Sequence, residues 1–328
     1  MAGVPGKIYD IEGRTWVGPF KVIKNKDRVI LLRNDKYFKS KSKSGEIIFH
    51  LLTETEAVMK ANAGTVDDLA MISLNGTEVT SKEGEWQSLP MWATWIIGFD
   101  QRVVPFNSRS FRCELLRHLK SIDFVHDLFP NQNVAFGLIP FGLPGYIDSA
   151  EDNGNKSLKL ERYLKENDVS VWIPKELSLL GRISAWIEEK TGTSSIRVHP
   201  KAVKYEEMIK SYASGRMGAF LLSINEELPA PLLVSSLEST SGSNFLGIKS
   251  AIVDGLISTI RQADDPYQAS KSYEQLNLFL NSDCALVPLF HVKRLVWRKK
   301  CVKGLELSPV SEGYFNYRNV SVECKEKV

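Results

Sequence analysis

The side chains that most often carry out chemistry are scattered in this sequence. Five histidines occur, no two of them stand at the spacing of metal ligands on one helix face, and HExxH is absent. The GxSxG, GxGxxG and phosphate-loop patterns are absent as well. Glu226 and Glu227 are the one carboxylate pair that we single out, and they are a weak signal of paired titrating groups. No local constellation predicts an enzyme, and a dispersed active site remains only as an alternative.

The four cysteines, Cys113, Cys284, Cys301 and Cys324, show no zinc pattern. None belongs to a CxxC motif or stands close to a histidine. The chain is also too long and too poor in cysteine for a disulfide framework. Cys301 and Cys324 could form a bridge, but spacing alone cannot show the geometry that a bridge requires. We therefore favour small buried thiols, and the pairing of Cys301 with Cys324 stays open.

Composition places the chain among ordinary globular proteins. It has 328 residues, of which 43% are hydrophobic and 25% charged, which favours about two domains and excludes collagen, coiled coil and general disorder. The net charge of +3 is too small to indicate a nucleic-acid binder. No apolar run reaches the roughly 18 residues of a membrane span. The first ten residues lack the basic and apolar regions of a signal peptide.

Strands and helices alternate along the chain, a pattern typical of α/β proteins. Two strands are predicted around a polar turn at 25–27, and Thr53 and Glu56 form a capping box before a helix that Gly64 ends. Residues 136–146 are predicted to be a loop because they are dense in Gly and Pro. Further strands are predicted at 45–52, 92–99, 169–174, 197–199, 219–224, 286–290, 294–297 and 314–317. Helices are predicted at 53–62, 108–122, 157–167, 182–190, 205–214, 253–263 and 267–281.

Four stretches together resemble one protein family. They are TWVGPFKVIKNKDRVILLRNDKYF, IIFHLLTETEAVMKANAGTVDDL, VVPFNSRSFRCELLRHL and the long run from GRMGAFLLSINEELPAP to CALVPLF, followed by Val302–Lys303–Gly304. In order and spacing they are similar to blocks of the extracytoplasmic solute-binding proteins that serve ABC importers, family 5, the dipeptide, oligopeptide and nickel type. The resemblance covers residues 16 to about 320.

The resemblance implies a fold and a division into lobes. The expected fold is α/β, two-lobed and periplasmic-binding-protein-like (class II), with ligand bound where the lobes close on it. We expect residues 1–90 and 291–328 to be what remains of lobe I, and residues 91–290 to be lobe II. Crossover strands are expected at 90–99 and 286–291, side by side. Family members carry more of lobe I before the first block, so we expect a shortened chain whose missing part would have held the export signal.

The resemblance also suggests which residues bind a ligand. Peptide-binding members anchor the ligand's amine with an Asp in the loop that reads INEELPAP here, so Glu227, with Glu226 beside it, falls at that place. Ile224 and Ala230 replace a Trp and a second Asp of the family pattern. Lys175 is the nearest match to an Arg that holds the ligand's carboxylate in dipeptide-binding members, although Lys cannot form the planar bidentate contact.

Trp92, Trp95 and Trp172 could line side-chain pockets, because aromatic walls suit varied ligands. Core packing is the competing interpretation for each of these tryptophans, and we favour it. No cofactor or metal is called for by any of these residues.

These observations predict the substrate-binding component of an ABC importer. It would bind a peptide or a similar small solute, act as a monomer with a membrane permease, contact no nucleic acid, and work in the periplasm or another extracytoplasmic space. The alternative is the ligand-sensing effector domain of a cytosolic transcriptional regulator, which the scattered cysteines suit slightly better.

Overall fold

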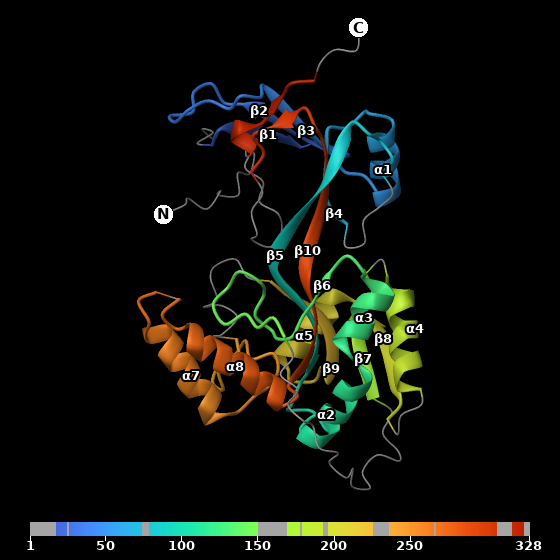
Figure 1. Ribbon diagram of the computed structural model, residues 1–328, viewed down its shortest axis with the longest axis vertical. Coiled ribbons are helices and arrows are strands. Elements are labelled where there is room, and N and C mark those ends of the chain that lie inside the picture. Colours follow the sequence, from blue (N-terminus) through green and yellow to red (C-terminus); the bar gives the residue numbers. More distant parts are fainter. Residues whose placement is uncertain are drawn as a thin grey trace. The chain divides into compact units, whose positions relative to one another are not determined.

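The computed structural model describes residues 18–24, 26–73, 79–149, 169–177, 179–192, 196–225, 236–265, 267–306 and 317–324. The chain divides into two compact units (Figure 1). Unit 1 comprises residues 1–89 and 294–328, and unit 2 comprises residues 90–293. That these units are the two lobes that close on a ligand stays a prediction.

Unit 1 begins with an antiparallel three-stranded sheet in the order β1–β2–β3. Its strands are β1 (Phe20–Lys24), β2 (Arg28–Arg33) and β3 (Glu46–His50), and the helix α1 (Glu54–Asn62) and strand β4 (Asp68–Ser73) follow. The predicted capping box is present, because Thr53 Oγ1 accepts from the Glu56 backbone N–H and the Glu56 carboxylate accepts from the Thr53 backbone N–H. Gly64 has a φ of 70°, which confirms the predicted helix end.

Unit 1 contains a buried cluster around Trp297. Ala57, Ala61, Leu69 and Trp297 are buried together, and four half-buried side chains pack against them: Leu52, Val66, Val79 and Trp86. Gly84 allows this packing, since a Cβ there would lie 2.4 Å from the Trp297 ring. Phe20, Val296, Val302 and Val320 are further buried apolar side chains of unit 1.

Unit 2 is built on strands of a mixed sheet. The sheet has the order β4–β10–β5–β9–β7–β8, of which β4 belongs to unit 1, and β6 also pairs with β10. Strand β7 runs parallel to both β8 and β9, whereas β9 runs antiparallel to β5. The bounds are β5 (Gly84–Phe99), β6 (Asn133–Val134), β7 (Val169–Pro174), β8 (Val198–Val203), β9 (Ala219–Asn225) and β10 (Leu286–Lys299).

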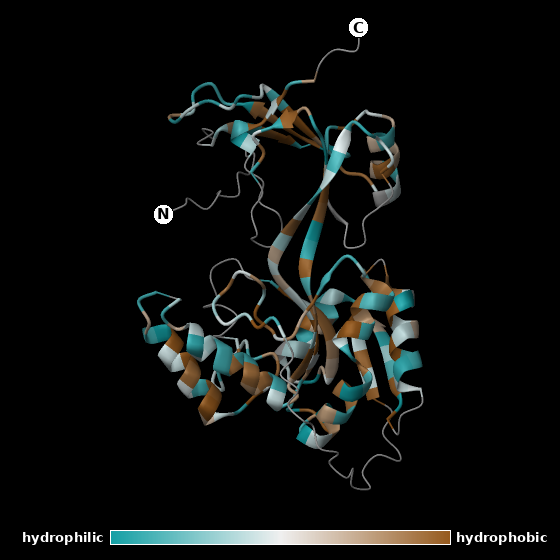
Figure 2. Ribbon diagram, in the orientation of Figure 1, coloured by the Kyte–Doolittle hydropathy of each residue, from teal (hydrophilic) through white to brown (hydrophobic). Residues whose placement is uncertain are grey.

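Helices cover both faces of this sheet (Figure 1). One layer holds α2 (Arg109–His118), α3 (Ser121–Leu128) and α4 (Leu180–Thr191), and the other holds α5 (Tyr205–Ala213), α7 (Ala251–Gln262) and α8 (Ser270–Ser282). Successive strand residues point to opposite faces, so Ile96 packs with Phe220 and Leu276 while Trp95 stacks on Phe290. Figure 2 shows hydrophobic residues along the strands and on the helix faces turned toward them. No helix within the described ranges is long and apolar enough to cross a bilayer.

Strands β5 and β10 are neighbours in the sheet, and each has residues in both units. Thr94 Oγ1 lies 2.9 Å from His291 Nδ1, and the Phe99 N–H donates to the Ala285 carbonyl at 3.3 Å. The predicted crossover strands therefore lie side by side. The strands predicted at 286–290 and 294–297 are one continuous strand, β10.

Three predicted elements need correction or fall outside the description. The helix predicted at 108–122 breaks after His118, because buried Leu119 has non-helical angles (φ −96°, ψ 62°), and α3 starts at Ser121. Ile122 is 60% exposed, so its helical spacing from Leu115 did not reflect a shared buried face. Tyr317 begins a 3₁₀ turn, Tyr317–Asn319, rather than ending a strand. The helix predicted at 157–167 lies outside the described residues.

The preference for free thiols is wrong. The structure contains two disulfides, Cys113–Cys284 within unit 2 and Cys301–Cys324 within unit 1. The first joins residues 171 positions apart, and nothing in their sequence context indicates that α2 and the start of β10 come together. The second is the pairing that the sequence left open.

The two disulfides differ in access, and this predicts the order in which they are reduced. Cys113 and Cys284 are 2% and 0% exposed, whereas Cys301 is half-buried and Cys324 is exposed. Thiol–disulfide exchange needs direct attack on a sulfur, so a thiol reductant should open Cys301–Cys324 at least tenfold faster in the folded protein. Alkylation followed by peptide mass mapping measures both rates. Equal rates without denaturant would contradict the buried placement of Cys113–Cys284.

Candidate functional site

The candidate site is the edge of the unit 2 sheet where its parallel strands end. Strand β7 ends at Pro174 and pairs there with Val203, the last residue of β8, and β9 ends nearby at Asn225. Open α/β sheets bind ligands at the carboxyl ends of their parallel strands. Because β5 is antiparallel to β9 with Ala93 opposite Asn225, Trp92 belongs to the same edge.

Lys175 follows the end of β7 in the chain, and Glu226 and Glu227 follow the end of β9. Lys175 comes immediately after β7, is exposed, and its backbone N–H donates to the Val203 carbonyl at 2.9 Å. No ion pair of its ammonium group is found within the described ranges. Glu226 and Glu227 lie outside the described residues, but the chain leaves β9 at Asn225 to enter residues 226–235. The register thus brings Lys175, Trp92 and the start of the INEELPAP segment to one edge.

The three tryptophans take different places. Trp95 is 9% exposed and stacks on Phe290 with centroids 5.5 Å apart, so the structure places it in the core. Trp92 is half-buried against the opposite core layer. Trp172 is also half-buried, and the Lys201 ammonium group lies 4.7 Å from its ring centroid. Of the three, Trp92 is the one at the site edge.

The Gly- and Pro-rich loop at 136–146 adds aromatic side chains that the sequence analysis did not identify. Phe141 is 52% exposed and its ring lies edge-on to Tyr146, with centroids 5.4 Å apart. Tyr146 in turn lies edge-on to His291 on β10, also at 5.4 Å. Burial raises the pKa of the Tyr146 phenol. The signal that could have identified these residues is the presence of two large aromatic residues in a loop of Gly and Pro.

Two amides of α8 fix this loop. Asn277 is fully buried, its Nδ2 donates to the Gly145 carbonyl at 3.1 Å, and its Oδ1 accepts from the Leu138 N–H at 2.7 Å. Asn281 Nδ2 donates to the Phe136 carbonyl at 2.6 Å. Gly137 must be glycine, since a Cβ there would lie 2.5 Å from the Asn277 amide. A buried amide that satisfies backbone groups at both ends of a loop holds the loop in one conformation.

His291 is a buried neutral side chain beneath this edge. It is 3% exposed, and the hydroxyl of fully buried Thr94 lies 2.9 Å from its Nδ1. Burial lowers the pKa of His291 to about 4 from its usual 6.5. Its role at neutral pH is therefore that of an uncharged hydrogen-bonding partner between β5 and β10.

An apolar cavity of about 260 Å³ adjoins the end of β9. Helix α5 supplies Tyr205, Met208 and Tyr212 to it, and β9 supplies Ile224 and Asn225. Burial raises the pKa of the Tyr212 phenol, whose hydroxyl donates to the Ser243 carbonyl. Among the described residues no group of three His, Cys, Asp or Glu side chains could hold a metal ion. The arrangement offers apolar and aromatic walls with a few polar groups, which suits ligand binding.

Comparison of the sequence with protein-family models and with curated proteins gives no match. The structure, however, matches solved structures over most of the chain. The periplasmic binding protein DppA from Helicobacter pylori, in complex with the peptide STSA, has a TM-score of 0.74 at 16% identity, with 94% of this chain and 63% of that chain covered. The oligopeptide-binding protein AppA from Bacillus subtilis, in complex with a nonapeptide, gives 0.73 at 15%, with 93% and 66% covered.

NikA from Brucella suis, in complex with Fe(III)-EDTA, gives a TM-score of 0.73 at 14% identity, with 93% of this chain and 68% of that chain covered. The chain has the fold of ABC-transporter substrate-binding proteins. The resemblance expected from the sequence is thus confirmed at the level of the fold. The chain spans 62% of the substrate-binding protein CtaP from Listeria monocytogenes, which it matches with a TM-score of 0.73 at 12% identity over 88% of this chain.

The burial of His291 predicts how the stability of the protein depends on pH. The folded pKa of about 4 lies below the usual 6.5, so the unfolded chain takes up a proton first as the pH falls. Above pH 6.5, His291 does not change the free energy of unfolding. Between pH 6.5 and pH 4, its protonation in the unfolded chain lowers the free energy of unfolding by about 3 kcal/mol in total.

The comparison of His291→Asn with the unchanged protein isolates this contribution, because Asn does not titrate. Urea unfolding at pH 7, 5.5 and 4.5 should show a smaller decline for His291→Asn. A matched His50→Asn variant, at an exposed histidine, should decline as the unchanged protein does. Parallel declines of all three proteins would show that His291 is not buried in its neutral form.

Proposed function

We propose that this protein is the substrate-binding component of an ABC importer and that it binds a peptide or a similar small solute. The observation that carries the proposal is the edge of the unit 2 sheet, in a fold shared with proteins solved in complex with peptides. At that edge a cation, Lys175, and the segment that holds Glu226 and Glu227 follow neighbouring strand ends.

In this proposal the two ends of the ligand meet opposite charges. The ligand's amine is bound by Glu227, with Glu226 beside it, and its carboxylate by Lys175, because charge-assisted hydrogen bonds are stronger than neutral ones. Trp92 and Phe141 offer apolar surface to the ligand's side chains. Trp95 is left out of these contacts, since its ring stacks on Phe290 and lies tilted against Phe129.

The compartment and the partner belong to the same proposal. Two disulfides persist in an oxidising space such as the periplasm, and the cytosol would keep the thiols reduced. They therefore support an extracytoplasmic protein. In this proposal that protein delivers its ligand, as a monomer, to a membrane permease. They also disfavour the alternative of a cytosolic regulator, for which the comparisons offer no support.

Calorimetry with di- to pentapeptides tests the proposal. Peptides with free ends should bind, and acetylated, amidated copies should bind at least tenfold more weakly, since each lost charged contact costs about 1.5–3 kcal/mol. Glu227→Gln and Lys175→Gln should each weaken binding of free peptides by about 10–100-fold.

Matched variants at exposed positions away from the edge, Glu188→Gln on α4 and Lys210→Gln on α5, should leave the affinity unchanged. No binding of any peptide by the folded chain, or equal losses for the edge and control variants, would overturn the proposed site.

A further inference from the structure

The loop at residues 136–146 of unit 2 packs against α8 at both of its ends. Gly137 and Gly145 approach this helix so closely that a Cβ would lie 2.5 Å from the Asn277 amide at the first and 2.3 Å from Tyr273 Cβ at the second. The fully buried side chain of Asn277 bonds to a backbone group near each end of the loop. One side-chain amide therefore joins the beginning of the loop to its end.

The backbone of the loop supplies little order of its own. Its residues belong to no helix or strand, and Pro140 and Pro144 have no N–H to donate. Two turn bonds form within it, from the Leu143 N–H to the Pro140 carbonyl at 3.3 Å and from the Tyr146 N–H to the Leu143 carbonyl at 3.2 Å. The bond that Asn277 accepts is shorter, at 2.7 Å, and lies in the core. The conformation of the loop therefore depends on this amide.

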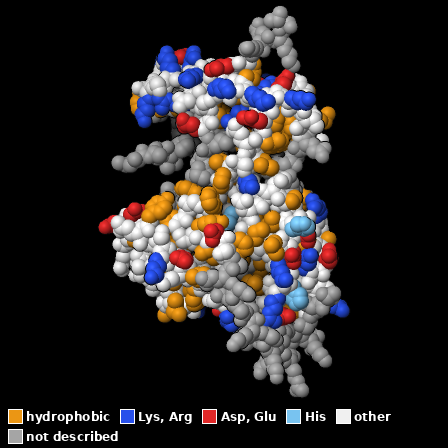
Figure 3. All heavy atoms as spheres, viewed as in Figure 1, with side chains coloured by type: hydrophobic (Ala, Val, Ile, Leu, Met, Phe, Trp, Pro, Cys, Tyr) orange, Lys and Arg blue, Asp and Glu red, His pale blue; other side chains and the backbone are white. Residues whose placement is uncertain are grey.

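The loop buries most of its apolar side chains and exposes one aromatic ring. Leu138, Ile139 and Leu143 are buried in the core, whereas Phe141 is 52% exposed. Figure 3 shows other hydrophobic side chains at the surface of unit 2, so exposure alone does not distinguish Phe141. Its distinguishing feature is that the residues around it are fixed.

Other rings support the Phe141 ring. It lies edge-on to Tyr146, and Tyr146 lies edge-on to buried His291, with 5.4 Å between centroids in each pair. The next residue, Gly142, has a φ of 88°, and a Cβ on it would lie 3.7 Å from Trp92 Nε1. Two aromatic side chains, Phe141 and Trp92, are therefore placed at the same turn of the loop.

We propose that Asn277 is a positioning residue of the ligand site and that the loop it holds selects peptides with an aromatic side chain. This inference rests on the proposed function. A loop that is already ordered binds at a lower entropic cost, and an aromatic pair gains free energy beyond its buried area. Asn277 itself does not touch the ligand; it acts through the position of Phe141.

Hydrogen exchange of the full chain tests the positioning role without a ligand. Asn277→Asp removes the donor to the Gly145 carbonyl, so the amides of residues 136–146 should exchange at least tenfold faster than in the unchanged protein. Asn244→Asp is the matched control, because Asn244 is a buried amide that bonds to both backbone groups of Ile248 instead. It should leave exchange in the loop within twofold.

A second variant covers the case in which a carboxyl at the fully buried position 277 prevents folding. Asn281 is half-buried, and its amide donates only to the Phe136 carbonyl at the start of the loop. Asn281→Ala should therefore fold and should speed exchange of the loop amides at least threefold.

Calorimetry with the tripeptides Ala-Phe-Ala and Ala-Ser-Ala tests the selectivity. The unchanged protein should bind Ala-Phe-Ala at least tenfold more tightly. Asn277→Asp and Phe141→Ser should each bring the two affinities within threefold of each other, mainly by weakening Ala-Phe-Ala. A general loss of structure would weaken both peptides alike, so the ratio of the two affinities isolates the role of the loop.

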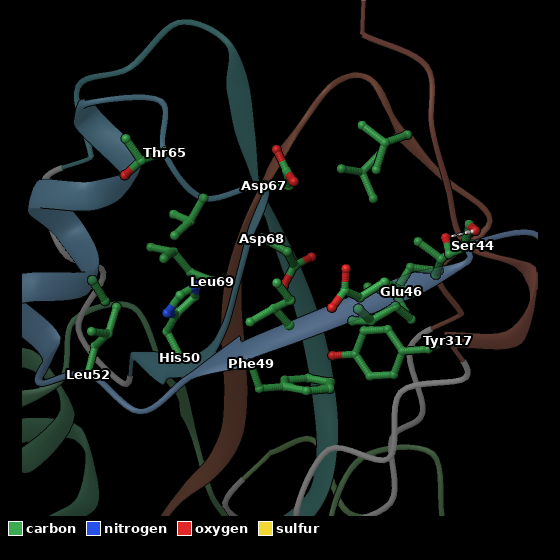
Figure 4. A pocket seen from close by; sticks show the side chains of 18 residues that line it. Ser44, Glu46, Phe49, His50, Leu52, Thr65, Asp67, Asp68, Leu69 and Tyr317 are labelled. Atoms are coloured by element: carbon green, nitrogen blue, oxygen red, sulfur yellow. Dashed lines mark hydrogen bonds between the residues drawn. The ribbon is translucent and has the colours of Figure 1, made fainter. Parts of the chain in front are cut away.

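A control in unit 1 tests where the aromatic side chain binds. Unit 1 has a cavity of about 420 Å³ with many apolar lining residues, and Figure 4 shows Phe49 and Tyr317 among the side chains around it. Ile48→Ser changes a 41% exposed residue of that lining and should leave the affinity ratio unchanged. A ratio that Ile48→Ser lowers and Phe141→Ser preserves would overturn the proposed selectivity.

The remaining outcomes separate this inference from the proposed function. If the unchanged protein binds no peptide at all, the proposed function and the selectivity both fail, and exchange alone decides whether Asn277 holds the loop. Equal affinities for the two tripeptides, or a ratio that Asn277→Asp preserves, would overturn the selectivity and leave the proposed function standing. Loop exchange that neither Asn277→Asp nor Asn281→Ala speeds would overturn the positioning role.

Discussion

The pairing of β5 with β10 is the constraint on which the rest of the structure depends. These strands are 16 and 14 residues long, well above the usual five or six, and each has residues in both units. Paired strands fix each other's register, and β9, β7 and β8 follow β5 in the strand order. Thr94 and His291 contribute a buried polar contact at this pairing, which an apolar pair could not supply.

One end of β10 is fixed by two consecutive residues of α2. Arg112 is 2% exposed, and its guanidinium donates to the carbonyls of Phe106, Asp283 and Cys284 and to the Asp283 carboxylate. Cys113 forms its disulfide with Cys284. Burial lowers the pKa of Arg112, but the ion pair with Asp283 opposes that shift and satisfies the buried charge. The start of β10 is thus held by a covalent bond and a charged network together.

The sequence predicted what depends on local patterns. The capping box of α1, the end of that helix at Gly64 and the two strands around residues 25–27 involve residues close in the chain, so spacing reveals them. The break between α2 and α3 depends on how buried Leu119 and exposed Ile122 meet the rest of the fold, which spacing does not show. The Cys113–Cys284 bond joins residues 171 positions apart and left no local signal.

The same distinction applies to the candidate site. Lys175 could be chosen from the resemblance, since it stands next to a recognisable strand. Trp92 was one of three candidate tryptophans, for each of which core packing was the favoured interpretation. Tyr146 and Phe141 could not, because their placement depends on Asn277 and Asn281 of α8, more than 130 positions away. Side chains positioned by distant amides are identifiable only once the packing is known.

The strands of the two units are covered and paired in different ways. In unit 2, helices cover both faces of the strands, and buried aromatic and aliphatic clusters fill both layers. In unit 1, one buried cluster packs around Trp297. Phe20, Val302 and Val320 are buried as well, and the outer edges of β3 and β4 pair with no strand in the described ranges. Natural proteins cover, shorten or charge such edges, because an open edge invites pairing with other chains. Strand β3 has charged or polar residues at both of its ends, Glu46 and His50, but apolar ones between them. Its short length and its charged or polar ends therefore limit its pairing with other chains.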